Sequence, residues 1–450
     1  MTDAMPQNLP EIEVRTMRKV TWKLIPFLCI CFMAAFMDRV NVGFAKQQMV
    51  IDLGFSDAVY GFGAGVFFIG YFLFEVPSNL IMEKVGARLW IARIMVVWGV
   101  VSACMAFVHS ASGFYWLRFL LGASEAGFFP GVILYLTYWF PPAYRSRTVA
   151  LFMTSAVLSN VIGGPISGAL LELDGVLGIP GWKWLFVTES IPSIALGIVV
   201  FFRLPRGPEQ ARWLHAGERE WLVARQLADK QQQTASEGER SFLQTLSDPR
   251  VLLLCAVYFA NVIGGYGLDF FLPTLIKRAF PAATPAFVGV LSAVPPLFAI
   301  FAMMLHGRSS DRHAERRWHV ATALWWAALG LLLASLPVSA AFALFALALA
   351  VSGRWSTIAP FWGLSTTFLS GRAAAGAIAL INAVGNLGGF AGPYMMGFMK
   401  DRTGDYIVGL RILAGAMFCG GLLALLVRPR GGRKIEIVGA KAGVGSSSLA

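Results

Sequence analysis

Long apolar stretches recur along almost the whole of this 450-residue chain. Each is about 20 residues long, which is enough for a helix to cross a hydrocarbon core of about 30 Å. Charged residues make up only 14% of the chain, whereas soluble proteins contain about 25%. The pattern predicts an all-α integral membrane protein that has no separate water-soluble domain of useful size.

The apolar stretches form two groups of six. We expect transmembrane helices at 20–45, 57–82, 89–109, 113–139, 148–172 and 183–203, and again at 250–276, 286–306, 318–337, 339–370, 373–399 and 406–427. The expected regions are an N-terminal segment (1–19), an N-terminal bundle (20–203), a linker (204–249), a C-terminal bundle (250–427) and a disordered tail (428–450). Periodic Trp and Leu residues around 213–222 predict a surface helix within the linker.

Positive charge indicates how the chain is oriented. The short loops carry nine Lys and Arg residues on one side and six on the other, and the Arg-rich linker and tail fall on the side with nine. We therefore expect both termini in the cytoplasm. The net charge of +12 lies mostly at the ends of the apolar stretches, so it does not indicate a nucleic-acid partner. The first 19 residues are polar and do not resemble a cleavable signal peptide.

The reactive residue types show no arrangement typical of an enzyme. Five cysteines are scattered through apolar segments, and the five histidines lie at helix ends or in loops. Neither set has the spacing of metal ligands, and no nucleophile lies beside a base or in a phosphate-binding glycine loop. We expect no metal, no cofactor and no catalytic activity.

The two halves of the chain contain similar loops. The segment NLIMEKVGAR (79–88) follows the second expected helix, and GRSSDRHAERR (307–317) follows the eighth. Each places an acid four residues after a small or polar residue, and a base follows. Internal repeats of this kind are typical of alternating-access transporters, whose substrate site lies where the halves meet.

These loops resemble the G-x-x-x-D-R/K-x-G-R/K motif of the major facilitator superfamily, with Asn79 and Glu83 replacing its Gly and Asp in the first copy. The chain is most similar to the anion:cation symporters, and within them to the bacterial tartrate and phthalate transporter-like branch. Transporters for galactonate, glucarate and hexuronates are close relatives. Five segments carry this resemblance: DRVNVGFA (38–45), GYFLFEVPSNLIMEKVGAR (70–88), RFLLGASEAGFFPG (118–131), YGLDFFLP (266–273) and AAAGAIALINAVGNLGGFAGP (373–393). The resemblance implies twelve transmembrane helices in two pseudo-symmetric six-helix bundles.

Four charged residues lie where hydrocarbon is expected. Asp38 and Arg39 are adjacent, and Arg118 and Glu125 are seven residues apart, which places them on nearly one helix face. Each charge would cost at least about 2.5 kcal/mol at the centre of a membrane helix, so a functional role is expected. We interpret the two arginines as anion clamps, because guanidinium matches a carboxylate. We interpret the two acids as proton-coupling groups, and the galactonate-type relatives imply the same roles. The alternative is a purely structural set of ion pairs.

Polar residues of other helices complete the expected cavity. Substrate contacts are predicted for Tyr71, Asn261, Tyr266, Ser365, Asn382 and Asn386, although such residues also hold membrane helices together. Two further charges, Asp269 and Arg354, either pair with each other or leave Arg354 free to bind the distal carboxylate of a diacid. Ion pairs at the cytoplasmic helix ends are expected to latch an outward-open state, and the gating residues are Glu75, Glu83, Arg88, Arg145, Asp311 and Arg312.

The expected function is proton-coupled import of a small organic anion across the inner membrane by a monomer. A dicarboxylate such as tartrate, or an aromatic carboxylate such as phthalate, is the expected substrate. A sugar-acid symporter, a proton-coupled exporter of metabolites or drugs, and a non-transporting sensor are the alternatives.

Overall fold

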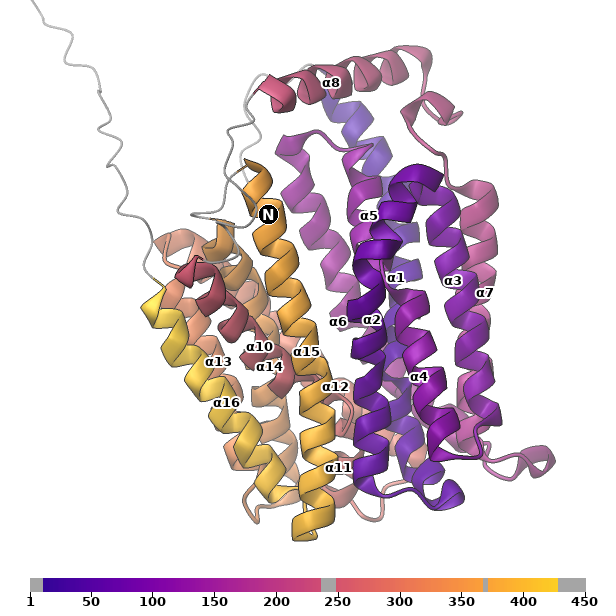
Figure 1. The fold of residues 1–450 in the computed structure, drawn as a ribbon, viewed down its shortest axis with the longest axis vertical. Coiled ribbons are helices and arrows are strands. Elements are labelled where there is room, and N and C mark those ends of the chain that lie inside the picture. The colour runs from indigo at the N-terminus through magenta and orange to yellow at the C-terminus, as the bar shows by residue number, and fades with distance from the viewer. Residues whose placement is uncertain (1–10, 236–247, 367–370, 428–450) are drawn as a thin grey trace, which may run out of the picture.

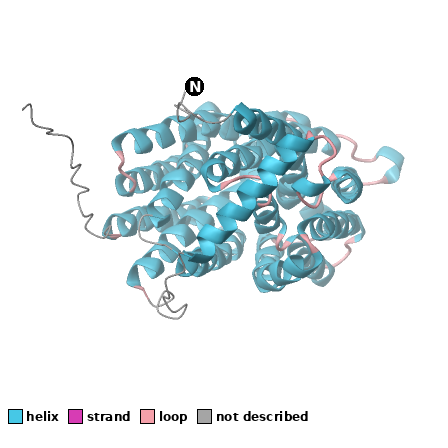
Figure 2. Cartoon of the chain, turned by 90° about the horizontal axis from the view of Figure 1, so that it is seen from above, coloured by secondary structure: helices cyan, strands magenta, loops and turns pink. Residues whose placement is uncertain are grey.

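The computed structural model describes residues 11–235, 248–366 and 371–427, and every described element is a helix or a connecting segment (Figure 2). The N-terminal half contains α1 (Glu11–Leu53), α2 (Asp57–Val85), α3 (Ala87–Cys104), α4 (Ala111–Glu125), α5 (Phe128–Thr137), α6 (Pro142–Leu171) and α7 (Gly181–Arg203). The linker contains α8 (Ala216–Ala235). The C-terminal half contains α10 (Pro249–Asp269), α11 (Leu272–Ala279), α12 (Pro285–His313), α13 (Arg317–Ala334), α14 (Ala340–Thr366), α15 (Gly371–Thr403) and α16 (Ile407–Leu426).

The helices of each half pack into one bundle, and the two bundles stand side by side (Figure 1). Ten helices in the described ranges are long and apolar enough to span a membrane. In the C-terminal bundle α13 packs against α14, and α15 packs against α10. Counting α4 with α5 and α10 with α11 gives twelve spans in two bundles of six, which confirms the predicted fold class.

Two spans that the sequence predicts to be continuous are interrupted. The helix expected at 113–139 breaks after Glu125, where Gly127 has a φ of +89° that favours glycine. The hydroxyl of Ser78 donates to the freed carbonyl of Ala126 at 2.6 Å. The helix expected at 250–276 breaks after Asp269, and Pro273 stands in the first turn of α11. Each break therefore places a carboxylate at the end of a half-helix.

The linker helix predicted by the sequence is confirmed by α8, which lies across the end of the molecule (Figure 1). It docks on α1, where the Glu218 carboxylate pairs with Lys19 at 3.0 Å and with Arg15 at 3.1 Å. Burial of Glu218 opposes its ionisation, but the backbone N–H of His215 and the Lys19 ammonium together lower its pKa. Because α1 already begins at Glu11, it extends beyond the expected span 20–45 to reach this contact.

The bundles meet along two seams that depend on glycine. Helix α2 packs on α15, and a Cβ at Gly65 would lie 2.6 Å from the Phe390 carbonyl oxygen. Helix α6 packs on α12, and a Cβ at Gly168 would lie 2.6 Å from the Pro285 carbonyl oxygen. Missing side chains at these positions let the backbones of the two halves approach closely.

Candidate functional site

Arg39 of α1 lies at the centre of the interface between the bundles. Its Nη2 forms an ion pair with Glu125, the last residue of α4, and its Nη1 donates to the Tyr266 hydroxyl of α10 at 3.0 Å. The guanidinium also lies over the rings of Phe67 and Tyr71, at 5.4 and 5.5 Å from their centroids. Only 12% of the Arg39 side chain is exposed. Arg39 therefore connects an acid of its own bundle to a hydroxyl of the other.

A second buried ion pair lies in the C-terminal bundle. The Arg354 guanidinium of α14 contacts the Asp269 carboxylate at 2.5 Å, and both side chains are 8% exposed. The same guanidinium lies 5.1 Å from the Tyr266 ring centroid and 4.8 Å from that of Trp355. Of the two possibilities left by the sequence, pairing with Asp269 is the one that this conformation shows. Tyr266 is therefore in contact with both arginines.

The Arg39–Glu125 and Arg354–Asp269 pairs lie on corresponding helices of the two halves, but the acid and the base have changed places. Glu125 and Arg354 each stand fourteen residues after the first residue of their helix, α4 and α14. Their partners, Arg39 and Asp269, come from the first spans of the two halves. The repeat therefore places one cation and one carboxylate in each bundle, all four at the interface around Tyr266.

Asp38 lies away from this centre, although it precedes Arg39 in the chain. Its carboxylate accepts hydrogen bonds from Trp98 Nε1 and the Ser102 hydroxyl of α3, both at 3.0 Å, and from the Ser193 hydroxyl of α7 at 2.5 Å. Successive helix residues point about 100° apart, so one turns inward to the bundle and the other toward the interface. Both acids were expected to neutralise the arginines. Glu125 pairs with Arg39, whereas the Asp38 carboxylate is hydrogen-bonded by residues of α3 and α7.

Arg118 also differs from its expected position. It is fully buried, and its guanidinium donates to the backbone carbonyls of Gly63 at 3.4 Å and Ala64 at 3.1 Å on α2. The ring of Phe270, from the other bundle, lies 5.7 Å away. Arg118 has no exposed surface, so its guanidinium is closed to an anion in this conformation. Its role as an anion clamp stays a prediction.

The other polar residues expected in the cavity make contacts of four kinds. Tyr71 packs on Arg39, as described above. Asn382 donates to the Glu75 carboxylate at 2.9 Å across the α2–α15 seam, so a residue expected to bind substrate contacts one expected to act in gating. Ser365 bonds to the Phe361 carbonyl of its own helix. Asn261 Oδ1 and Asn386 Nδ2 are buried without a hydrogen-bond partner among the described residues.

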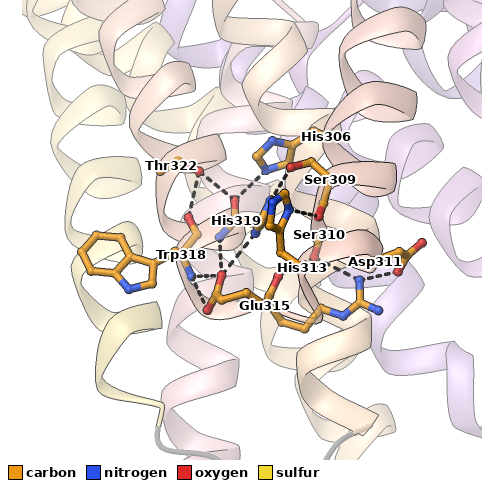
Figure 3. A network of polar contacts seen from close by, with 10 residues as sticks. His306, Ser309, Ser310, Asp311, His313, Glu315, Trp318, His319 and Thr322 are labelled. Atoms are coloured by element: carbon orange, nitrogen blue, oxygen red, sulfur yellow. Dashed lines mark hydrogen bonds and ion pairs between the residues drawn. The ribbon is translucent and has the colours of Figure 1, made fainter.

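The remaining gating residues form no ion pair between the bundles in the described part of the chain. Asp311, in the last turn of α12, pairs with Arg316 at 2.6 Å, and Arg316 also donates to the Ser310 hydroxyl. Figure 3 labels Asp311 and Ser310. Arg145 donates to the Phe140 carbonyl at 2.9 Å. Glu83, Arg88 and Arg312 have no ion-pair partner within the described ranges. The latch was expected only for an outward-open state, so it stays a prediction.

A latch that the sequence analysis missed joins the bundles at the end opposite α8. Lys46 of α1 is 4% exposed and contacts the Asp57 carboxylate at 2.5 Å and the Tyr406 hydroxyl at 2.9 Å. Tyr406 in turn donates to Asp57 at 2.9 Å, and Asp401 accepts from the backbone N–H groups of Asp57 and Ala58. Because Tyr406 and Asp401 belong to the C-terminal half, this network holds that end closed.

Two helical bundles with paired charges at their interface are the arrangement found in transporters that have a substrate site between two repeats. The sequence model of the Major Facilitator Superfamily matches residues 28–281. The chain therefore belongs to this superfamily, and it is a transporter and not an enzyme.

Curated relatives support this assignment over almost the full length. The chain is 48% identical over 426 residues to the "Putative tartrate transporter" of Agrobacterium vitis, which covers 95% of this chain and 94% of that protein. It is 45% identical to the "Putative metabolite transport protein NicT" of Pseudomonas putida, with 89% of this chain and 91% of that protein covered. It is 40% identical to a "Quinolone resistance transporter" of Acinetobacter baumannii, with 93% and 96% covered.

Solved structures share the fold. The xylose transporter XylE of E. coli in an inward-open conformation matches with a TM-score of 0.73 at 14% identity, covering 92% of this chain and 98% of that one. A bacterial homologue of the human lysosomal transporter Spinster, inward-facing and unoccupied, matches with a TM-score of 0.72 at 17% identity, covering 94% and 100%.

Proposed function

We propose that this transporter imports a small organic anion together with protons. The observation that carries the proposal is the Arg39–Glu125 pair, in which an internal carboxylate occupies the site that a substrate carboxylate would take. A substrate that binds Arg39 displaces Glu125, and the displaced acid, buried and without its cation, favours protonation. Protonated Glu125 in turn frees Arg39 for the anion. This reciprocity is what couples two ligands thermodynamically.

A dicarboxylate is the substrate class that we favour. Arg39 and Arg354 belong to different bundles, and both contact Tyr266. An anion with two carboxylates can engage one arginine of each half and so favour closure of the halves around it. The relatives named as tartrate transporters support this choice. Phthalate has the same two-carboxylate chemistry. The sugar acids are the first alternative, of which galactonate and the hexuronates have one carboxylate and glucarate has two.

We propose further that the protein lies in the inner membrane with both termini in the cytoplasm. The loop charges support this orientation, and it places α8 on the cytoplasmic side. The network around Lys46 then links the two halves on the periplasmic side. Both bundles come from one chain, so a monomer contains a complete pathway.

Breaking the Lys46 latch is expected to open the periplasmic side. Lys46→Met keeps an unbranched apolar chain among the rings of Tyr60, Phe271 and Tyr406 but leaves Asp57 without its cation. Loss of one partner of a buried pair costs about 3–5 kcal/mol, enough to shift a two-state equilibrium strongly. Spin labels at the exposed Leu177 and Arg402, in a chain whose cysteines are replaced, should show a longer distance population.

Lys183→Met is the matched control for this experiment, because Lys183 lies at the same end and forms no ion pair within the described ranges. It should leave the label distances unchanged. If the two variants gave the same distance distribution, the network around Lys46 would not be the latch.

Uptake into proteoliposomes tests the proposed function. Purified protein is expected to accumulate labelled tartrate above its external concentration when the outside is acidic, and to reach only equilibrium without a pH gradient. Phthalate, galactonate, glucarate and glucuronate are then added as competitors. The extent to which each reduces tartrate uptake ranks the anions by affinity. Accumulation that ignores the pH gradient would remove proton coupling from the proposal.

Proton-coupled export is the second candidate, and the relative named as a quinolone resistance transporter favours it. An exporter would use the inward proton gradient to expel its substrate. Preloaded vesicles with an acidic exterior would then lose substrate faster than vesicles without a gradient, whereas an importer would retain it.

A further inference from the structure

A chain of buried polar groups crosses the N-terminal bundle, and the mechanism proposed above does not use all of it. Helix α1 starts beside α8 and α7 ends toward it, so these two helices run in opposite directions. Asp38 accepts from Ser193. One turn farther along α1 stands Asn41, and one turn back along α7 stands Glu189, so the two face each other.

Glu189 is a buried carboxylate without a cation. It is 5% exposed, and the ion pairs found among the described residues do not include it. Helices α1, α3 and α6 pack against α7. The charged group that faces Glu189 from them is Asp38, another acid, while α3 contributes Ser102 and Trp98, which bond to Asp38, and α6 contributes the Ser167 hydroxyl.

Some polar atoms around Glu189 lack partners. The Asn41 amide, which is 1% exposed, lies beside the Glu189 carboxylate, but neither its nitrogen or oxygen nor the Glu189 Oε2 meets a described residue with the distance and angle of a full hydrogen bond. An isolated ionised carboxylate away from water is very costly. Among the described residues, the charged group beside Glu189 is a second acid, so a bound positive charge would stabilise the Glu189 carboxylate. A proton supplies that charge without the larger ligand shell of a metal ion.

Glu189 is also connected to the interface between the bundles. Its Oε1 accepts a hydrogen bond from Ser167 at 2.6 Å. Ser167 lines a pocket that both bundles enclose, and the other polar groups of that pocket are Asn160, Ser292 and Asp269. A single hydroxyl therefore separates the buried acid from a pocket that contains the partner of Arg354.

We propose that Glu189 is a further proton-binding site of this transporter, reached from the pocket through Ser167 and supported by Asn41. Ser167 passes its hydroxyl proton to Glu189 and takes up a proton from a hydronium ion in the pocket, which is left as water. One O–H bond breaks at Ser167 while one forms at Glu189, and the carboxylate becomes a neutral acid. The site deepens the proposed proton coupling, on which it rests, because it gives the N-terminal bundle a proton store separate from the Arg39–Glu125 pair.

Infrared difference spectroscopy of the purified full-length protein during a pH step tests this site directly. In the wild type we expect a carbonyl band of a protonated, buried carboxylic acid, and Glu189→Gln should remove that band. Glu220→Gln, at an exposed acid of α8, should keep it. Ser167→Ala should keep the band but slow its appearance after the step, because the hydroxyl link is lost.

Two results would overturn the proposal. One is a set of carboxylic-acid bands that Glu189→Gln leaves unchanged. The other, which decides the question even if Glu189→Gln does not fold, is a Ser167→Ala protein whose band appears at the wild-type rate. The infrared measurement does not depend on transport. A protein that transported anions without protons would therefore refute the proposed function, and the Glu189 band would still test the proton site by itself.

Discussion

Glu125→Gln is expected to abolish proton-driven accumulation while counterflow exchange of the anion continues. The amide has the shape of the protonated acid, so the variant mimics the state in which Arg39 is free for substrate. It cannot release a proton, however, so the pH gradient no longer drives the cycle. Accumulation in proteoliposomes should fall to simple equilibrium with the medium at every pH gradient. Binding of the anion should stay the same or become tighter, since no internal carboxylate competes for Arg39.

The control for this prediction is Glu220→Gln, which alters an exposed acid of α8, outside the interface between the bundles. It should keep gradient-driven accumulation. If Glu125→Gln still accumulated the anion against its concentration gradient, Glu125 would not be the proton-coupling residue. Asp38 and Glu189 would then be the candidates to test for that role.

The sequence predicted the division into two bundles, the number of membrane spans and the charged residues within those spans, because all of these follow from local composition. It could not predict the directions in which those charges point. Asp38 and Arg39 are neighbours in the chain, yet one is held by α3 and α7 and the other reaches α10. Which face of α1 meets which helix is decided by tertiary packing, and no pattern within α1 specifies it.

Errors in helix boundaries explain part of what was missed. The first span was expected to end at residue 45, so Lys46 was counted as a loop charge that orients the chain. Helix α1 instead continues to Leu53 and buries Lys46 in the closed end. Glu189 did leave a signal, since it is a single acid within the expected span 183–203. Its significance depends on Ser167 and Asn41, which come from distant parts of the chain.

Removing Arg354 is expected to weaken the binding of diacids strongly. Its ion pair with Asp269 determines how this prediction must be tested. Arg354→Gln alone would leave Asp269 buried without a cation, at a cost of about 3–5 kcal/mol, so loss of folding would mask any effect on binding. The double variant Arg354→Gln/Asp269→Asn removes both charges and should keep a melting temperature near that of the wild type. If Arg354 binds the distal carboxylate of a diacid, this variant should bind tartrate or phthalate much more weakly. It should bind a monoacid such as galactonate almost as the wild type does.

The expected loss follows from the interaction removed. A hydrogen bond to a charged group contributes about 1.5–3 kcal/mol, which corresponds to roughly a tenfold to hundredfold weaker affinity for the diacid alone. The matched control is Arg225→Gln/Asp229→Asn, which removes an Arg–Asp pair within the linker helix α8 and should leave both affinities unchanged. Calorimetric titration of each purified double variant with one diacid and one monoacid gives the answer. Equal losses for both anions would mean that Arg354 and Asp269 stabilise the C-terminal bundle and do not read the second carboxylate, because only a direct contact can distinguish an anion that has that group from one that lacks it.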